Sequence, residues 1–332
     1  MGIVLSGMRP TGDLHLGHYV GALKNWLQFQ EEHTAYFCLV DWHALAGEGY
    51  RRSKQIQGHI RQMAIGFLAA GVDPKKATLF VQSHVKEHAE LHLLLSMITP
   101  TPWLLRNPAV KDQARDLGLI KDESEITSID YGYLGYPVLQ AADILLYQAD
   151  LVPVGEDQLP HLELTREIAR RFNHLFGATF KEPQGKLTQT PRLLGLDNRK
   201  MSKSLDNCID LPDAPRDIEK KVKKMITDPL KVRLGDVGHP EVCNVFTYHK
   251  TFNALEAADI ERDCRSGALP CGTCKVNLAG KVADELAGFR ERHAALVADP
   301  SAVDGFLEEG AVRARATAAK NLERAKVAAG LA

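Results

Sequence analysis

The sequence has few cysteines, no excess of either charge and no long apolar segment. Six cysteines in 332 residues are too few for a disulfide-held scaffold. Lysine and arginine number 41 against 42 aspartate and glutamate, a formal net charge of -1, so any site for a polyanion must be local. No apolar run approaches the roughly 18 residues that cross a bilayer, and residues 1–10 lack a signal-peptide pattern. We therefore expect a cytoplasmic protein without membrane spans.

The composition is that of an ordinary globular protein. Hydrophobic residues make up 45% and charged residues 25% of the chain, which excludes disordered, collagen-like and coiled-coil proteins. At roughly 100 to 200 residues per domain, the length allows about two domains with cores of their own. We see no internal repeat and no low-complexity segment.

Short apolar runs alternate with helical patterns over the first part of the chain. The apolar runs cover residues 3–6, 36–40, 78–82 and 151–154. The helical patterns cover residues 16–30, 53–70, 137–147 and 157–172. This alternation predicts right-handed βαβ units and a parallel sheet of the Rossmann type.

The pattern changes after residue 204. Residues 215–227, 275–297 and 301–327 have a helical pattern, and no convincing strand occurs among them. We therefore predict an α/β domain over residues 1–205 and a helical domain over residues 206–332.

A polar loop with two histidines separates the first predicted strand from the first predicted helix. Its sequence, TGDLHLGH, contains His15, Gly17 and His18. In a βαβ unit this loop lies at the carboxyl end of the sheet, where helix N-terminal N–H groups favour anions. A glycine between the histidines lets a ligand approach the backbone, which suits nucleotide phosphates. A histidine that merely caps the helix is the alternative for this loop taken alone.

A second polar loop, KMSKS, occupies residues 200–204 at the predicted domain boundary. Lys200 and Lys203 flank small polar residues and can close on a triphosphate, neutralising charge on the leaving group. A solvated turn is the alternative. The histidine loop resembles the HIGH signature and residues 200–204 are a full KMSKS signature. In this order the pair is typical of class I aminoacyl-tRNA synthetases, which implies ATP and Mg²⁺.

A polar face occurs within an otherwise apolar helical segment. Tyr136, Gln140, Asp143 and Tyr147 follow one another at intervals of 4, 3 and 4 residues, so they share one side of a helix. A carboxylate on such a helix is costly to bury without a hydrogen-bond donor. A structural salt bridge of Asp143 is the alternative to a ligand site.

The segments around this face closely resemble bacterial tryptophanyl-tRNA synthetases. The similar segments are SGMRPTG (6–12), HYVGAL (18–23), VDWH (40–43), AADILLY (141–147) and VPVGEDQ (152–158). The resemblance extends to about residue 230 and implies a homodimeric ligase that joins L-tryptophan to tRNA(Trp). Tyrosyl-tRNA synthetase, a non-synthetase adenylyltransferase and a regulatory paralogue are the alternatives. The context of Asp143 argues against the first, and the long helical C-terminal part argues against the second.

The resemblance implies roles for the residues of the amino-acid pocket. Asp143 accepts the indole N–H, the single hydrogen that the tryptophan side chain donates. Tyr136 and Gln158 hold the α-amino group. The other residues implied to line the pocket are Gly7, His43, Gln140, Val152 and Val154. Gln140 stands where some relatives have methionine over the indole.

The same resemblance implies the nucleotide site. His15 and His18 contact the ATP phosphates, and Gly17 leaves room for the adenine. Lys200 and Lys203 bind the pyrophosphate moiety. The remaining residues implied for this site are Arg9, Met201 and Ser202. Arg9 stands where many relatives have glutamine beside the adenylate.

Four of the six cysteines fall within one segment of the C-terminal half. Cys243, Cys264, Cys271 and Cys274 are separated by 20, 6 and 2 residues. Four thiolates hold either a structural Zn²⁺ or an iron-sulfur cluster, and zinc ribbons usually have two Cys-x-x-Cys pairs whereas one occurs here. The pattern resembles a subset of bacterial tryptophanyl-tRNA synthetases that carry a 4Fe-4S cluster. We expect that cluster, with zinc as the alternative.

Two groups of basic residues lie on the predicted C-terminal helices. One is KKVKK at residues 220–224. The other consists of Arg313, Arg315, Lys320, Arg324 and Lys326. A solvated helix face accounts for either group alone, whereas a tRNA substrate needs local positive charge for its phosphates. The resemblance implies that residues 206–332 bind the tRNA anticodon.

Overall fold

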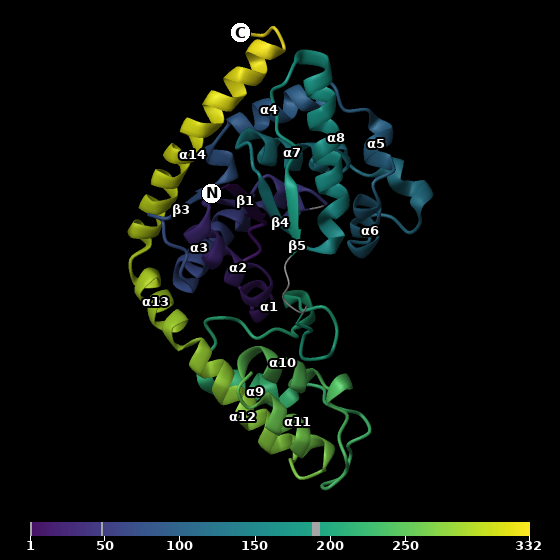
Figure 1. Cartoon of the computed structure of the whole chain (residues 1–332), viewed down its shortest axis with the longest axis vertical. Coiled ribbons are helices and arrows are strands. Elements are labelled where there is room, and N and C mark those ends of the chain that lie inside the picture. Colours follow the sequence, from purple (N-terminus) through teal and green to yellow (C-terminus); the bar gives the residue numbers. More distant parts are fainter. Residues whose placement is uncertain (1, 48, 188–192) are drawn as a thin grey trace.

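The computed structural model describes residues 2–47, 49–187 and 193–332, and it has a part built on a sheet and a helical part at its other end (Figure 1). Five parallel strands form one sheet in the order β3-β2-β1-β4-β5. The strands are β1 (Ile3–Met8), β2 (Thr34–Leu39), β3 (Ala77–Val81), β4 (Leu151–Val154) and β5 (Gln184–Leu187). The predicted α/β fold with a Rossmann-type parallel sheet is confirmed.

The strand β5 has no counterpart among the predicted strands. Its sequence, QGKL, contains no apolar run, and all four residues are exposed. Pairing with β4, from Leu151 with Gln184 to Val154 with Leu187, places this segment at the edge of the sheet. Such a strand is set by a distant partner, so no local pattern predicts it.

Helices connect the strands and cover both faces of the sheet. Those of the sheet part are α1 (Leu16–His18), α2 (Lys24–Glu32), α3 (Ser53–Ala70), α4 (Glu87–Ser96), α5 (Thr101–Leu105), α6 (Pro108–Asp116), α7 (Tyr131–Leu146) and α8 (Leu159–Phe176). A π-helical turn, Tyr19–Leu23, interrupts the first predicted helix. The helix α7 begins six residues before the predicted start, because it continues across Pro137, which lies inside the helix. No helix in the described ranges combines the length and apolar character needed to cross a membrane.

Alternating residues of the central strands supply two hydrophobic cores. Phe37 of β2 faces one side, where it stacks on Trp26 of α2 with ring centroids 4.3 Å apart. Its neighbour Tyr36 faces the other side, where it packs against Tyr147 at 4.6 Å. This alternation follows from the period of two residues in a strand. Both faces of the parallel sheet are therefore buried.

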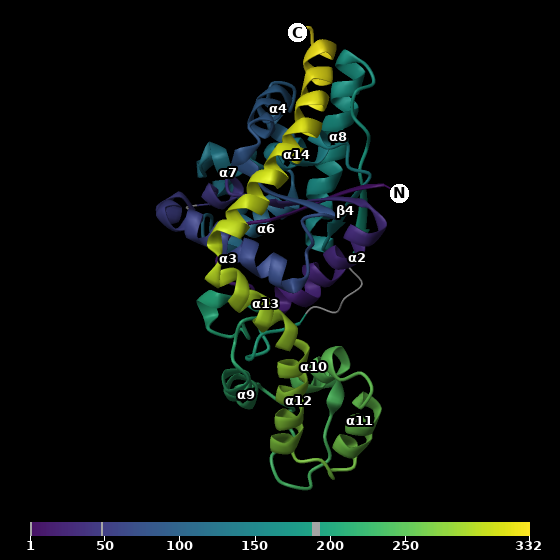
Figure 2. The same cartoon turned by 90° about the vertical axis from the view of Figure 1, so that its left-hand side faces the viewer.

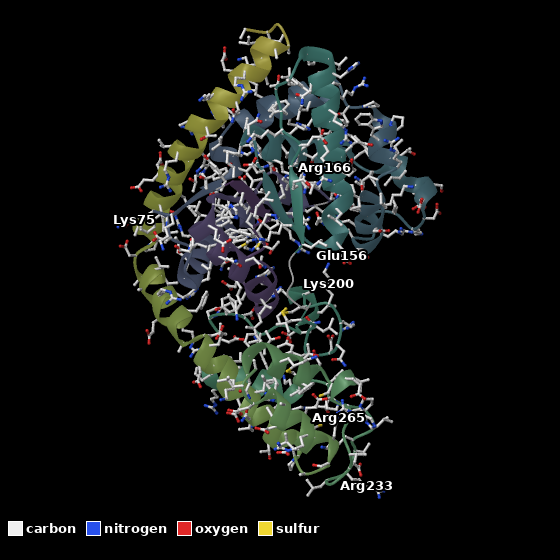
Figure 3. The ribbon with its side chains drawn as sticks, in the orientation of Figure 1. Lys75, Glu156, Arg166, Lys200, Arg233 and Arg265 are labelled. Atoms are coloured by element: carbon white, nitrogen blue, oxygen red, sulfur yellow. The ribbon has the colours of Figure 1, made fainter. Side chains whose placement is uncertain are left out.

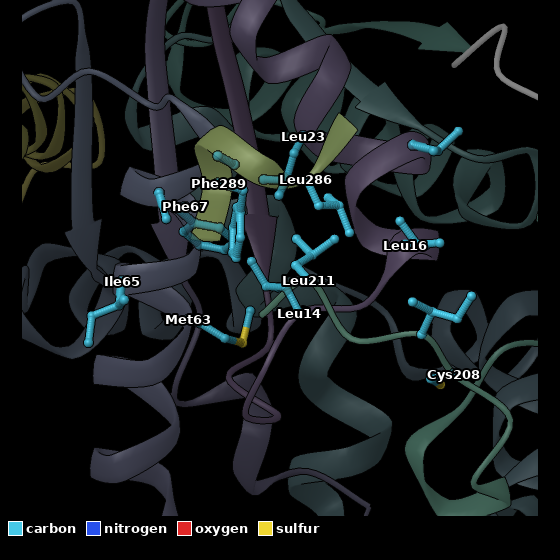
Figure 4. Close-up of a cluster of buried hydrophobic side chains, with 14 of the residues drawn as sticks. Leu14, Leu16, Leu23, Met63, Ile65, Phe67, Cys208, Leu211, Leu286 and Phe289 are labelled. Carbon is cyan, nitrogen blue, oxygen red and sulfur yellow. The ribbon is translucent and has the colours of Figure 1, made fainter. Parts of the chain in front are cut away.

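The remaining helices form the helical part and then return to the sheet. They are α9 (Pro215–Lys224), α10 (Asn244–Phe252), α11 (Ala257–Arg265), α12 (Cys271–Glu285), α13 (Ala287–Ala298) and α14 (Pro300–Ala328). Figures 1 and 2 show α13 and α14 running back along the sheet part, so that the C-terminus lies far from α9–α12. Leu286 and Phe289 join the core formed by Leu14 and Phe67 (Figure 4). The helices α13 and α14 therefore pack on the sheet part although they follow residue 205. The domain boundary at residue 205 stays a prediction.

Candidate active site

The histidine loop follows the carboxyl end of β1, as predicted. His15 is the N-cap of α1, its backbone N–H donates to Nδ1 of His18 (3.2 Å), and the two rings stack with centroids 3.7 Å apart. Burial and the charge of Lys203 lower the pKa of His15 to about 4. Burial, His15 and Lys203 lower the pKa of His18 to about 3. Both rings are therefore neutral at about pH 7. Nδ1 of His18 accepts the N–H of His15, so the proton of this ring is on Nε2.

The KMSKS segment lies directly against this loop. Just after this segment, the carbonyl of Ile209 accepts the backbone N–H of Leu16 over 3.0 Å. The ammonium of Lys203 donates to the carbonyl of Thr11 over 3.3 Å, and burial lowers the pKa of this lysine. The fold thus brings together two signature segments that are almost two hundred residues apart in the chain.

Gly17 and Met201 make a close contact between the two segments. The N–H of Gly17 lies 3.3 Å from Sδ of Met201, and a Cβ on Gly17 would lie 3.0 Å from the ring of His15. The backbone N–H of Ser202 donates to Asn207 over 2.8 Å. Lys200 is exposed and lies between the sheet part and the helical part (Figure 3). The structure therefore brings Met201 and Lys203 to the histidine loop and leaves Lys200 at the surface.

A cavity of about 310 Å³ opens at the carboxyl ends of β1 and β4. Its size is at the lower end of the range for small-molecule sites. Nine residues of the predicted sites line it: Gly7, Arg9, His43, Tyr136, Gln140, Asp143, Val152, Val154 and Gln158. All the residues predicted for the amino-acid pocket thus surround one cavity, and Arg9, predicted for the nucleotide, lines it too.

Asp143 is the buried carboxylate of this cavity, with 4% of its surface exposed. His43 Nε2 lies 3.0 Å from Oδ2, His88 Nδ1 lies 2.6 Å from Oδ1, and Gln82 Nε2 lies 2.8 and 2.9 Å from the two oxygens. Burial alone would raise the pKa of Asp143, but hydrogen bonds from His43 and His88 hold it well below its usual value. The carboxylate is ionised, and its two oxygens already receive four contacts from these three side chains, so a ligand N–H would share an oxygen with one of them.

Gln82 and His88 are site residues that sequence analysis missed. Gln82 follows β3 directly, and its Oε1 accepts the backbone N–H of Trp42 (3.2 Å), which fixes the orientation of the amide. His88 lies in the first turn of α4 and reaches the hydroxyl of Tyr147 through Nε2 (2.8 Å). For Gln82 the usable signal is a polar residue immediately after a buried strand, where the carboxyl ends of parallel strands meet, whereas His88 lies in the following helix and has no such signal.

Tyr136 is held by a second polar group. Its hydroxyl lies 2.8 Å from Oε1 of Gln113 and 2.8 Å from Nε2 of His161, and neither partner was predicted. Burial, followed by the nearby Tyr133, raises the pKa of Tyr136, so the hydroxyl keeps its proton. The predicted partner Gln158 lines the same cavity and donates to Asp157 over 2.8 Å.

The four C-terminal cysteines converge, as a shared site requires. Cys243 precedes α10, Cys264 lies in α11, and Cys271 and Cys274 lie in the first turn of α12; all four line one small cavity. Burial, followed by the neighbouring thiols, raises the pKa of Cys274 to about 12. Within the described residues, however, no group of three or more His, Cys, Asp or Glu side chains has an arrangement that could hold a metal ion. A metal site is therefore not confirmed.

Most of the basic residues are engaged within the protein. In α9 the ion pairs are Lys220 with Asp217, Lys221 with Asp210 and Asp213, and Lys223 with Glu219. On α14 the contacts are Arg313 to the carbonyls of Pro74 and Ala77, Arg315 to that of His84, Arg324 to that of Thr179, and Lys326 to Glu90. Four of the five residues of the second basic group therefore fasten α14 to the sheet part, and a role of this group in binding tRNA phosphates stays a prediction.

Comparison with known proteins identifies the family. The family model of class I tRNA synthetases (W and Y) matches residues 2–287. Tryptophan-tRNA ligases are 45% identical over 331 residues in Thermotoga maritima and 42% identical over 393 residues in Aquifex aeolicus, each alignment covering 99% of both chains. The crystal structure of tryptophanyl-tRNA synthetase from Campylobacter jejuni complexed with ADP and tryptophan has a TM-score of 0.85 at 32% identity, covering 99% of this chain and 100% of that chain. The chain belongs to the class I tRNA synthetases for tryptophan and tyrosine, and within them to the tryptophan-tRNA ligases.

Proposed function

We propose that this chain activates L-tryptophan with ATP and transfers the tryptophanyl group to tRNA(Trp). In the first step a carboxylate oxygen of tryptophan attacks the α-phosphorus of ATP, and pyrophosphate leaves. In the second step a hydroxyl of the terminal tRNA ribose attacks the carbonyl carbon of the adenylate, and AMP leaves. One observation carries the proposal: an ionised, buried Asp143 lines a cavity of amino-acid size, together with Met8 and Arg9, which precede the histidine loop in the chain.

Asp143 selects the amino acid in this proposal. Tryptophan offers one side-chain hydrogen, the indole N–H, and an ionised carboxylate is its natural acceptor. A site built around a buried polar partner rejects analogues that lack the matching group. Val152 and Val154 line the cavity around the ring, and Tyr136 and Gln158 hold the α-ammonium group.

The two signature segments bind the nucleotide. His15 and His18 are neutral and therefore contact the phosphates as hydrogen-bond partners rather than as cations. Lys203, which already reaches the histidine loop, and Lys200 neutralise charge on the departing pyrophosphate. Mg²⁺ bound with ATP neutralises further phosphate charge. The first step needs little proton transfer, so catalysis rests on positioning and charge.

The decisive experiment is ATP-pyrophosphate exchange measured with each standard amino acid. Tryptophan should support exchange far above all others, and Asp143→Ala should lose it. Exchange driven by tyrosine would favour the tyrosyl alternative. Tryptophan binding without any exchange would favour a regulatory protein. Charging of tRNA(Trp) by the same preparation then tests the second step.

We also propose that the four cysteines bind a 4Fe-4S cluster, with structural Zn²⁺ as the alternative. Their thiols line one cavity, and the ammonium of Lys231 lies 4.0 Å from Sγ of Cys264, where it would offset thiolate charge. When bound, the group would tie α10, α11 and α12 together and contribute to folding there.

Metal analysis of anaerobically purified protein tests this site. Iron and sulfide in equal amounts, about four of each per chain, support the cluster, whereas zinc without colour supports the alternative. Cys271→Ser should lose the metal and destabilise the helical part while tryptophan still binds. Cys208→Ser, which alters a buried thiol outside the group, is the control. Protein that is folded and free of both metals would end the proposal.

Anticodon binding by residues 206–332, a homodimer and a cytoplasmic location complete the proposed function. Support for the dimer comes from a second cavity of about 250 Å³, lined in part by the exposed side chains of Leu45, Tyr50 and Tyr131. Light scattering should give the mass of two chains, and Tyr131→Asp should shift it towards one. A monomeric wild-type enzyme with full activity would remove the dimer from the proposal.

A further inference from the structure

Side chains from three helices meet around the hydroxyl of Tyr136 in α7. Asn107 is the N-cap of α6, and Gln113 lies farther along the same helix. His161 lies in the first turn of α8 and is almost completely buried, with 1% of its surface exposed. Asn107 is buried as well, so the protein itself supplies the hydrogen-bond partners of His161, whereas Gln113 and Tyr136 line the cavity.

The amide of Asn107 determines which nitrogen of His161 carries the proton. Its Oδ1 accepts the N–H of Ala109 over 3.0 Å, so its Nδ2 faces Nδ1 of His161 at 3.4 Å. An amide NH₂ offers only hydrogens, so Nδ1 of His161 must accept and carries no proton. Burial, followed by the charge of His43, lowers the pKa of His161 to about 4. The ring is therefore neutral, with its hydrogen on Nε2.

This tautomer sets the direction of the Tyr136 hydroxyl proton. Nε2–H of His161 donates to the hydroxyl oxygen over 2.8 Å, so it cannot accept from it. The proton of Tyr136 therefore goes to Oε1 of Gln113, also at 2.8 Å. Of the two lone pairs on the oxygen, one accepts from His161 and the other remains available. Tyr136 lines the proposed tryptophan cavity, so that lone pair is the one a bound ligand can use.

We infer that His161 and Gln113 are positioning residues. They direct the hydroxyl proton of Tyr136 to Gln113, and this leaves a lone pair of the hydroxyl oxygen for the α-ammonium group of the amino acid. The inference rests on the proposed function, in which Tyr136 holds that group. An ammonium has only hydrogens to offer. A hydroxyl proton turned towards it would replace a charge-assisted hydrogen bond with repulsion.

The test compares L-tryptophan with indole-3-propionate, which keeps the indole and the carboxylate but lacks the amine. Binding is measured by calorimetry without ATP. In Gln113→Leu the Tyr136 proton loses its acceptor, so tryptophan affinity should fall about tenfold or more, while indole-3-propionate changes less than about twofold. Gln113→Glu keeps an acceptor and should retain most of the tryptophan affinity. Binding of indole-3-propionate also shows that each variant is folded.

A matched pair tests the histidine. His161→Leu removes the donor and should weaken tryptophan more than indole-3-propionate, whereas His161→Gln places an N–H near the same position and should restore the wild-type ratio. Equal losses for both ligands in the leucine variants, or no rescue by glutamate or glutamine, would overturn the inference. If Tyr136→Phe leaves the preference for tryptophan over indole-3-propionate unchanged, the assigned role of Tyr136 in the proposed function fails instead.

Discussion

His88 donates its Nδ1 hydrogen to Oδ1 of Asp143 over 2.6 Å, and both side chains are buried. A carboxylate only accepts hydrogen bonds, so the direction of this bond is fixed. Gln82 donates to both oxygens of the same carboxylate. The charge and orientation of the proposed selectivity residue therefore depend on α4 and on the end of β3 as much as on α7.

Removing the amide of Gln82 should weaken the choice of tryptophan. Gln82→Met removes a hydrogen bond to a charged carboxylate, and such bonds each contribute about 1.5 to 3 kcal/mol to stability. Because the ionised form loses a donor, the pKa of Asp143 should rise. We expect the ratio of kcat/KM for tryptophan over phenylalanine in exchange to fall about tenfold or more. Gln30→Met is the control, because Gln30 is a buried glutamine of α2 whose amide bonds Gly71 and Asp73 instead. A ratio unchanged in both variants would contradict the role given to Gln82.

Losing the charge of Lys203 should slow adenylate formation without affecting the amino-acid pocket. Lys203→Met is expected to reduce pyrophosphate exchange at least about tenfold, as loss of transition-state charge stabilisation does. Tryptophan binding without ATP should stay within a few-fold of wild type. Lys224→Met removes an exposed lysine at the end of α9 and should leave exchange intact. Near-normal exchange by Lys203→Met would show that the KMSKS segment has another role.

The neutral histidines of the loop should make the protein less stable in mild acid. Their folded pKa values, about 4 for His15 and about 3 for His18, lie below the ordinary value of about 6.5. Between about pH 6.5 and about pH 4 the unfolded chain therefore binds more protons than the folded chain, and the free energy of unfolding falls as pH falls. Each histidine contributes about 1.4 kcal/mol per pH unit at most.

Urea unfolding at about pH 7 and at about pH 5 measures this loss. His15→Asn and His18→Asn should each lose less stability between the two conditions than the wild type does. His84→Asn, at an exposed position, should behave like the wild type. An identical loss in all four proteins would mean that the two loop histidines do not titrate as described.

The sequence predicted the residues that line the cavity better than the residues that hold those side chains in place. The cavity residues occur in segments with recognisable patterns, and the parallel sheet brings the ends of those segments to one edge. His161 lies in the helical segment predicted over residues 157–172, but its role depends on Asn107 and Gln113, more than 45 residues away in the chain. Because such partners are far apart in the chain, no local sequence pattern predicts that they will meet.

For the C-terminal helix, too, the sequence predicted the element but not its packing partner. Helical periodicity predicted residues 301–327, close to the observed Pro300–Ala328. The pattern does not say which surface the helix covers, and α14 covers β3 at the edge of the sheet. Arg313 is exposed and still donates to the carbonyl of Ala77 over 3.1 Å, so this residue also contacts the free edge of a strand.

At Gly310 the helix α14 lies directly against the backbone of that strand. A Cβ built on Gly310 would overlap the carbonyl group of Leu79, and Leu79 is paired with Phe37 of β2, so its backbone cannot move aside freely. Gly310→Ala should therefore lower the free energy of unfolding by about 1 to 3 kcal/mol, as overpacking does. This is opposite in sign to the usual effect, because alanine in a helix interior is favoured over glycine by about 1 kcal/mol.

Gly305 provides the matched control within the same helix. A Cβ at Gly305 would meet no atom within 4 Å, so Gly305→Ala should raise stability by up to about 1 kcal/mol. Urea unfolding of the two variants then separates helix propensity from docking, since the propensity gain is common to both. If Gly310→Ala were as stable as Gly305→Ala, α14 could not lie against the backbone of β3 at this distance. If only Gly310→Ala lowers the free energy of unfolding, the absence of a Cβ at Gly310 is what allows α14 to pack against the sheet.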